Sequence, residues 1–173
     1  CDAVPRATTR LVCAAALGVL LAVPQPGRAE PLDPRLAAAT RLYREEGAEK
    51  ALPVLETLAG SILQGSKTQD QAAVLHYLGE CHWRLGNFRQ SREYLDRALK
   101  LDRASGDGLA EGKTLNVLGL LSWDEGSYDQ AIADFRKAGA LARANGDKKL
   151  EGSSLNNLSL VHDEQGDYDT SLE

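Results

Sequence analysis

The sequence predicts an all-α fold built from repeated helical hairpins, and three observations support this prediction. First, Leu and Ala are the most frequent of the 173 residues while aromatic residues make up only 5%, a composition typical of helical proteins. Second, one phrase recurs every forty residues, as GNFRQSR from Gly86, GSYDQAI from Gly126 and GDYDTSL from Gly166. Third, the apolar residues between these phrases follow the spacing of a helix face. A fixed period of this length indicates stacked repeats.

Residues 1–29 are expected to form a secretory signal peptide that precedes the repeats. Arg6 and Arg10 stand before the apolar run LVCAAALGVLLAV, and prolines and small residues follow it up to Ala29. The run is shorter than the roughly 20 residues that cross a bilayer, which argues against a membrane anchor. We therefore expect an exported protein, periplasmic or secreted, that is cleaved after Ala29.

The charge of the remaining chain excludes some partners. Loss of residues 1–29 would remove three Arg and one Asp and so change the net charge from −5 to −7. This acidic chain shows neither the basic face of a nucleic-acid-binding protein nor a polybasic patch for membranes. Cys81 would be its only cysteine, so we expect no internal disulfide. Because the chain contains no Met and Glu173 interrupts an amphipathic segment, we interpret it as a fragment.

Residues 30–70 are expected to form a degenerate helical hairpin and a linker. That unit departs from the later ones at Glu49, where they carry an aromatic residue, and at Pro53, inside its second helix. Three further units follow, and the last one is incomplete. They are predicted at residues 71–110, 111–150 and 151–173.

Each unit should contain two helices separated by a glycine turn. Gly126 ends the first helix of its unit, since glycine readily adopts the left-handed backbone of a helix–helix turn. Ser127 follows at once and precedes Gln130 by three positions, which predicts a capping box at the start of the second helix. Gly79 and Gly119 should let the two helices of a pair approach closely.

These residues resemble the tetratricopeptide repeat (TPR) consensus, and the period resembles its forty-residue subgroup, whose usual LNNLG is echoed here by LNVLG and LNNLS. Small and aromatic residues at fixed places in each unit carry the resemblance. They are Gly79, Gly86, Phe88, Ala98, Gly119, Gly126, Tyr128, Ala131, Phe135, Ala138, Gly166 and Tyr168. The resemblance implies a right-handed superhelical solenoid of antiparallel helix pairs. It also implies a non-enzymatic module that binds a protein or an extended peptide in its concave groove.

In TPR arrays the first helix of each pair lines the groove. By that resemblance the groove of this chain would carry His76, Glu80, Trp83, Arg84, Asn116, Leu120, Trp123, Asp124, Asn156, Leu160 and Asp163. The amides of Asn116 and Asn156 would either bind the backbone of a peptide or remain solvated. The basic residues by which some TPR domains clamp a terminal carboxylate are not matched, and Glu80 and Asp124 would repel such a group.

Trp83 and Trp123 occupy one position in successive units. They are either aromatic anchors of the groove or filler between the units, and the two interpretations differ in whether the indole stays partly exposed.

The sequence offers little for chemistry. His82 and His162 occupy a position where the TPR consensus places a packed aromatic residue, so we expect them to be buried. His76 and Glu80 lie one helical turn apart, but the neighbouring Cys81 points off their face and no second cluster completes a metal shell. We therefore predict no catalytic residue, no metal ligand and no cofactor.

Two alternative functions stay open. Arrays with such units often precede a caspase-like CHAT peptidase domain in bacterial proteins. The resemblance therefore allows a regulatory or substrate-recruiting arm of an enzyme whose catalytic domain lies beyond residue 173. The other alternative is a scaffold that self-associates end to end through its open repeats.

Overall fold

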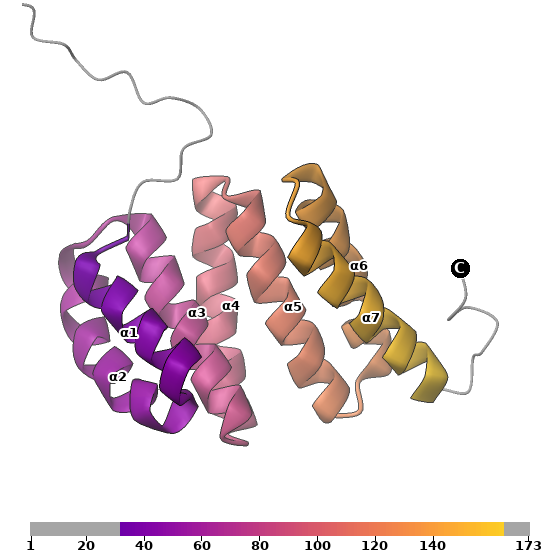
Figure 1. Cartoon of the computed structure of the whole chain (residues 1–173), viewed down its shortest axis with the longest axis horizontal. Coiled ribbons are helices and arrows are strands. Elements are labelled where there is room, and N and C mark those ends of the chain that lie inside the picture. The colour runs from indigo at the N-terminus through magenta and orange to yellow at the C-terminus, as the bar shows by residue number, and fades with distance from the viewer. Residues whose placement is uncertain (1–31, 165–173) are drawn as a thin grey trace, which may run out of the picture. The chain divides into compact units, whose positions relative to one another are not determined.

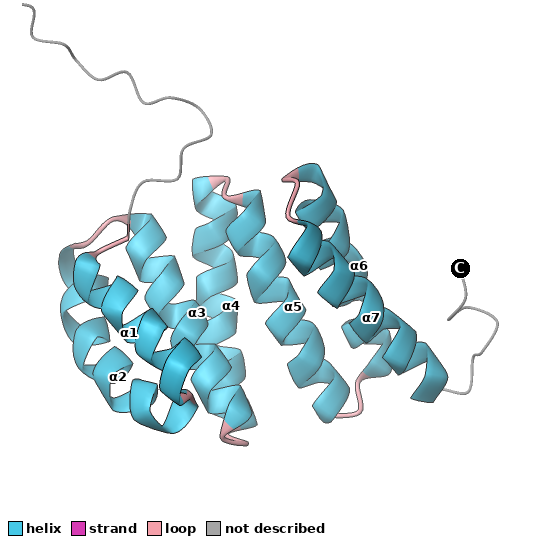
Figure 2. Ribbon diagram, in the orientation of Figure 1, coloured by secondary structure: helices cyan, strands magenta, loops and turns pink. Residues whose placement is uncertain are grey.

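The computed structural model describes residues 32–164, which form seven α-helices and no strand (Figure 1; Figure 2). The helices are α1 (Pro34–Glu46), α2 (Ala48–Gly65), α3 (Thr68–Arg84), α4 (Phe88–Ser105), α5 (Gly108–Asp124), α6 (Tyr128–Ala144) and α7 (Lys148–Glu164). The all-α prediction is confirmed for this part of the chain, where no helix is both long and apolar enough to cross a membrane. The expected signal peptide at residues 1–29 and the repeat positions Gly166 and Tyr168 lie outside the described residues.

The helices stack as successive antiparallel pairs in two layers. Each helix packs mainly on its neighbours in the chain, and α3 with α4 and α5 with α6 form the most extensive pairs. The first helices of successive pairs, α1, α3, α5 and α7, also contact one another. By contrast, α2 does not reach α4, and α4 does not reach α6. The first helices therefore form an inner layer and the second helices an outer one (Figure 1).

Four helices end in the same type of glycine turn, and these turns are twenty residues apart in the sequence. Gly86, Gly106, Gly126 and Gly146 all have φ between +71° and +76°. In each turn the N–H after the glycine donates to the carbonyl five residues earlier, as in a Schellman motif, for example from residue 127 to residue 122 at 2.8 Å. The positive φ and this hydrogen bond confirm the predicted turn at Gly126. Glycine suits the position because it adopts this backbone without strain.

The predicted capping box at Ser127 is wrong. Neither Ser127 before α6 nor the equivalent Asn87 before α4 makes a side-chain capping bond. Their ψ angles of 66° and 61° lie well short of the extended values that aim an N-cap side chain at the helix. Gln130 donates to Asp134 Oδ1 at 3.0 Å instead. Asp107, whose ψ is 85°, does cap α5. Its carboxylate oxygen Oδ1 accepts a hydrogen bond from the backbone N–H of Ala110 at 2.9 Å.

The close approach predicted at two glycines is confirmed. A Cβ atom on Gly119 would lie 2.6 Å from Cε1 of Phe135, and one on Gly79 would lie 2.5 Å from Cγ of Leu95. Phe135 and Leu95 are buried, so their side chains fill the space that a larger residue would need. The absence of a side chain on the first helix therefore decides how closely the second helix packs.

Small and aromatic residues complete the core between the helices. Ala98, Ala131 and Ala138 are fully buried, where small side chains allow a neighbouring helix to pack closely. Phe88 and Tyr128, which follow the glycine turns, are partly buried against the adjacent clusters. These positions behave as the repeat pattern predicts.

The last described helix leaves apolar residues exposed. Leu155 on α7 is 51% exposed, whereas the equivalent Leu115 on α5 is 2% exposed. Leu115 lies on a helix that packs on both α4 and α6, and α7 contacts only α5 and α6 among the described helices. Burial at this repeat position therefore depends on the second helix of the same pair.

Candidate functional site

The residues expected to line the groove all lie on α3, α5 and α7, in the inner layer. Their exposure varies. Arg84, Asp124, Asn156, Leu160 and Asp163 are exposed, and His76, Glu80, Trp83, Asn116, Leu120 and Trp123 are partly buried. The partly buried members are joined across helices by hydrogen bonds that repeat along the stack.

Two tryptophans link successive inner helices. Trp83 Nε1 on α3 donates to Asp124 Oδ2 on α5 at 2.6 Å. Trp123 on α5 donates to Glu164 on α7. Donor and acceptor are 41 residues apart in both bonds, so one bond recurs at the repeat period. Both indole rings also pack against hydrophobic clusters. Each tryptophan thus fills space between units while part of its surface stays exposed.

A second pair of bonds joins the same helices closer to their N-terminal ends. His76 Nδ1 lies 3.1 Å from Thr114 Oγ1, and forty residues later Asn116 Oδ1 accepts from Ser154 Oγ at 3.2 Å. Asn116 Oδ1 also lies 3.4 Å from an amide nitrogen of α7. The Asn116 oxygen is therefore engaged within the stack, whereas Asn156 is exposed.

Thr114 connects this inner surface to a buried carboxylate. Its hydroxyl donates to Asp102 Oδ2 at 2.8 Å, and Asp102 is 3% exposed. Since the hydroxyl hydrogen is used in this bond, His76 Nδ1 must be the donor to Thr114. Burial raises the pKa of Asp102 to about 6, an effect that Asp107 and Glu111 increase and the Thr114 hydrogen bond opposes. Burial lowers the pKa of His76, and Glu80, whose carboxylate lies 3.8 Å from Nε2, opposes this shift.

An aromatic surface continues from α3 to α1. The rings of Tyr43 and Tyr77 are 5.7 Å apart, and those of His76 and Tyr77 are 5.1 Å apart, both edge to face. The Arg84 guanidinium lies 5.7 Å from the Tyr43 ring and donates to its hydroxyl. It also lies 3.4 Å from a carboxylate oxygen of Glu80. This cluster fixes Arg84 at the edge of the inner layer.

Reasoning from the sequence missed several residues of this surface. Tyr77 and Lys113 stand three residues before the predicted Glu80 and Asn116, on the same sides of their helices. Arg44 belongs to the degenerate first unit, for which no groove residue was predicted. Helical spacing was the signal that could have identified them, since residues three and four apart share a face.

His82 and His162, which share one repeat position, are buried, and so is Cys81. His82 is 4% exposed and stacks on Tyr94 with ring centroids 5.4 Å apart, and His162 is 5% exposed. Burial raises the pKa of the Cys81 thiol to about 12, so no reactive thiolate forms near neutral pH. Within residues 32–164, no group of three or more His, Cys, Asp or Glu side chains is placed to hold a metal ion.

Known proteins share this arrangement. Among solved structures, a Podosopora anserina protein described as a putative kinesin light chain with nearly identical TPR-like repeats superposes with a TM-score of 0.66 at 12% identity. The match covers 79% of this chain and 68% of that one. A single-residue variant of that protein gives a TM-score of 0.65 with the same identity and coverage. Identity this low shows a shared fold alone. No curated protein matches the chain in sequence.

A sequence profile assigns the family. The profile of the tetratricopeptide repeat matches residues 70–144 and again residues 111–173. Together the two matches span more than half of the chain, and they agree with the helix pairs and the repeated glycine turns. The chain belongs to the tetratricopeptide repeat family.

Proposed function

We propose that this chain is a binding module that holds a protein or an extended peptide on its inner layer. The tetratricopeptide fold generally mediates protein–protein interaction, and repeat proteins of this class are generally non-enzymatic scaffolds. The observation that carries the proposal is the pair of tryptophans at the inner surface, each partly exposed and held by a bond to the next helix. A ring that is already immobilised loses little conformational entropy when a partner covers it. Trp is also among the residues that dominate binding energies.

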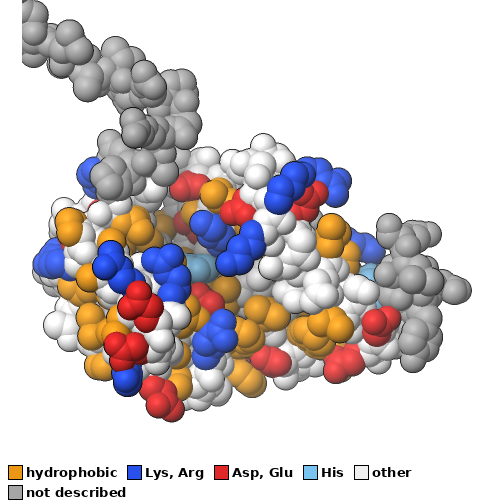
Figure 3. Space-filling view, viewed as in Figure 1, with side chains coloured by type: hydrophobic (Ala, Val, Ile, Leu, Met, Phe, Trp, Pro, Cys, Tyr) orange, Lys and Arg blue, Asp and Glu red, His pale blue; other side chains and the backbone are white. Residues whose placement is uncertain are grey.

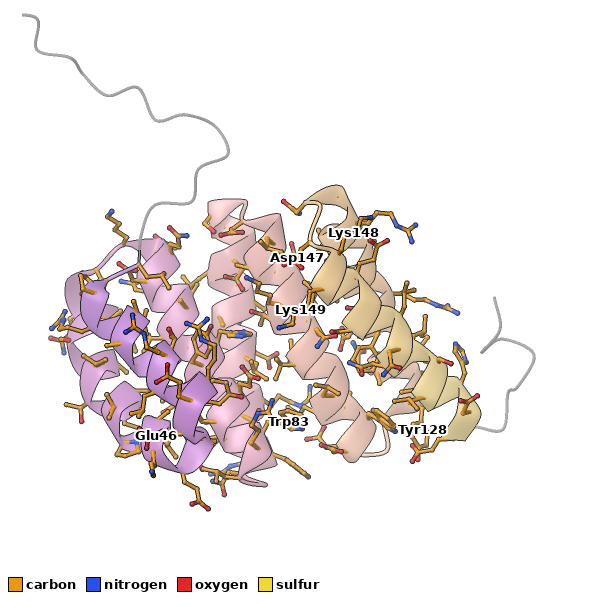
Figure 4. All side chains as sticks on the ribbon, in the orientation of Figure 1. Glu46, Trp83, Tyr128, Asp147, Lys148 and Lys149 are labelled. Atoms are coloured by element: carbon orange, nitrogen blue, oxygen red, sulfur yellow. The ribbon has the colours of Figure 1, made fainter. Side chains whose placement is uncertain are left out.

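A hollow beside the second tryptophan supports this proposal. It has a volume of about 360 Å³ and is lined by Trp123, Asp124, Gly126, Tyr128 and Glu164. Two aromatic rings and two carboxylates therefore border one opening. Trp83 and Tyr128 lie along the same edge of the stack in Figure 4. A peptide lying along this edge would meet aromatic surface at two successive repeats.

The test is selection of binders from a displayed library of random peptides. Peptides bound by the intact chain should lose affinity by about 2 kcal/mol with Trp123→Ala, measured by titration calorimetry. Arg136→Ala, an exposed change on the outer helix α6, is the control and should leave binding unchanged. Asn156→Ala is a second inner-layer variant, and because Asn156 is exposed it should not affect folding.

Two outcomes would count against peptide binding on the inner layer. If the selected peptides bind both inner-layer variants as tightly as the original chain, the inner layer is not the binding surface. If Trp83→Ala and Trp123→Ala each cost the roughly 3–5 kcal/mol of unfolding free energy that is typical of a lost core aromatic, the tryptophans are core filler.

We also propose that the N-terminal segment directs export of the protein. Residues 1–29 carry the pattern of a signal peptide, so expression behind a restored start codon should give a secreted product that begins at Glu30. N-terminal sequencing checks this, and an intact N-terminus in the membrane fraction would contradict it.

Two further proposals concern the ends of the stack. Self-association of the stack rests on the exposed Leu155 and Leu160 of α7, and sedimentation velocity at rising concentration would detect it. The recruiting-arm alternative, with a CHAT-like peptidase beyond residue 173, rests on the resemblance of the repeats alone. A Cys–His pair in the downstream coding sequence would support it, and a polar capping helix there would favour the simple binding module.

A further inference from the structure

The surroundings of Trp123 have a counterpart in the preceding repeat, and the two differ in charge. Trp83 and Trp123 occupy one repeat position, and Arg84 follows the first where Asp124 follows the second. The guanidinium of Arg84 lies 5.2 Å from the centre of the Trp83 ring, within the range of a cation–π contact. The first tryptophan is therefore covered by a cation of its own chain, whereas a carboxylate occupies that sequence position beside the second.

The surroundings of Arg84 show which groups hold such a cation. Its guanidinium also lies 5.7 Å from the centre of the Tyr43 ring and donates to the Tyr43 hydroxyl. A carboxylate oxygen of Glu80 lies 3.4 Å away, and Asp124 accepts the bond from the Trp83 indole at 2.6 Å. Aromatic rings and carboxylates together therefore stabilise one arginine side chain at this inner edge.

The hollow beside Trp123 presents the same kinds of group to solvent. Trp123 and Tyr128 are partly exposed, and Asp124 and Glu164 are exposed. Figure 3 shows hydrophobic and acidic side chains next to one another along the lower edge of the stack, where α5 and α7 end. Each carboxylate accepts an indole N–H and can accept further hydrogen bonds from a bound group.

The charge of these two carboxylates is not cancelled within the described chain. No ion pair joins Asp124 or Glu164 to a basic side chain of residues 32–164. Arg92 reaches this end of α5 from α4, but it pairs with the neighbouring Glu125. The net charge of −5 adds to the attraction of a cation. The hollow is therefore both aromatic and acidic.

We propose that this hollow binds an arginine side chain of the partner segment, with the guanidinium against the Trp123 ring and its N–H groups on Asp124 and Glu164. This inference rests on the proposed function and adds the chemical class of one occupant. Charge complementarity supports it. A planar guanidinium is the fitting group because it stacks on aromatic rings and donates several hydrogen bonds at once.

The experiment uses the blocked peptide Gly-Arg-Gly and, as its control, the same peptide with citrulline, which keeps the shape of arginine without its charge. The chain contains two Trp residues, so NMR of an isotope-labelled sample gives two indole N–H signals, which Trp83→Phe assigns. At low salt the arginine peptide should shift the Trp123 signal and leave the Trp83 signal nearly unchanged. It should bind at least about fivefold more tightly than the citrulline peptide.

The double variant Asp124→Asn with Glu164→Gln removes both charges and keeps an oxygen to accept each indole bond. It should bind the two peptides equally. Glu93→Gln with Asp96→Asn makes the same change of net charge at exposed positions on the outer helix α4 and should keep the preference for arginine. No preference for arginine in the original chain, or equal loss in the inner and outer variants, overturns the arginine site.

Arg84→Ala tests the comparison between the two repeats. It uncovers the Trp83 ring and leaves the carboxylates of Glu80 and Asp124 in place, so the Trp83 signal should now respond to the arginine peptide. A Trp83 signal that stays fixed in this variant also overturns the proposal, because the same kinds of group would then fail to hold an arginine.

The library-selected peptides separate this inference from the proposed function. If they contain no arginine and Trp123→Ala still weakens them, the inner layer binds peptides and the arginine site fails. If they contain arginine and lose affinity in the double variant Asp124→Asn with Glu164→Gln, both proposals are supported. If they ignore every inner-layer variant, the proposed function itself fails.

Discussion

The indole nitrogen of Trp83 lies 2.6 Å from a carboxylate oxygen of Asp124, and this bond ties the C-terminal ends of two inner helices together. Forty residues later the same bond joins Trp123 to Glu164. The stack is therefore held by a polar contact at each step along its inner edge, in addition to its buried core. This contact bears on stability and on how the aromatic rings are presented to a partner.

A double-mutant cycle should measure this bond. Trp83→Phe removes the donor and keeps most of the ring, and Asp124→Ala removes the acceptor. The coupling in the free energy of unfolding should be about 1 kcal/mol, because the bond is charge-assisted but solvent reaches it. Urea titrations give the four values. Arg89 and Glu93, a pair on α4 with 91% and 67% exposed side chains, should couple by less than about 0.5 kcal/mol.

Backbone conformation should decide the effect of alanine at two glycines. No atom lies within 4 Å of a Cβ added at Gly126 or at Gly60, but Gly126 has φ of +75° and Gly60 is helical. Gly126→Ala should therefore destabilise the chain by about 1 kcal/mol, and Gly60→Ala should stabilise it by about 0.5–1 kcal/mol. Thermal melts compare the two, and shifts of the same sign would contradict the assigned turn.

At two further glycines, both inside helices, the space around the added Cβ should decide how alanine changes stability. A Cβ on Gly119 would lie 2.6 Å from the Phe135 ring, and one on Gly152 meets nothing within 4 Å. We expect Gly119→Ala to cost about 1–3 kcal/mol of unfolding free energy through overpacking. Gly152→Ala should be neutral or slightly stabilising, since alanine favours helix. A harmless Gly119→Ala would show that α5 and α6 can separate without cost.

The buried carboxylate should make stability depend on pH. The pKa of Asp102 is raised to about 6 from 3.8, so the folded chain holds this proton more tightly than the unfolded chain. Its contribution is thus fully present below about pH 4 and is lost as the pH rises through about 6, by up to about 3 kcal/mol.

Asp102→Asn imitates the protonated side chain and provides the test. It should raise the melting temperature at pH 8 and have little effect at pH 4. Asp129→Asn, at an exposed position on α6, is the control and should not show this dependence. An equal effect of Asp102→Asn at both pH values would contradict the raised pKa.

The repeat pattern was enough to predict the helices and their close contacts. Gly119 and Gly126 stand at fixed places in each unit, and the structure gives one a crowded neighbour and the other a positive φ. Both properties are local to one helix pair. A pattern of forty residues contains all the residues that determine them.

Contacts between units were harder to predict. Leu155 aligns with Leu115 and is nevertheless 51% exposed, because α7 packs only on α5 and α6 among the described helices. The bond from Trp123 to Glu164 needs the relative rotation of two helices, which spacing alone does not give. The predicted cap at Ser127 was also wrong, although Asp107 follows the same kind of glycine turn and caps α5 at 2.9 Å, so the turn alone does not determine whether a side chain caps the helix.

The repeated bonds between inner helices also make the length of the array adjustable. Excision of residues 84–123 would join Trp83 directly to Asp124 and leave Glu164 at the place of its acceptor, 41 positions later, as in both present bonds. His76 would meet Ser154 in place of Thr114, again 38 positions away. A gene for this protein could thus gain or lose whole repeats while every new junction keeps a matching donor and acceptor. An excision one residue longer or shorter would put every later side chain out of phase.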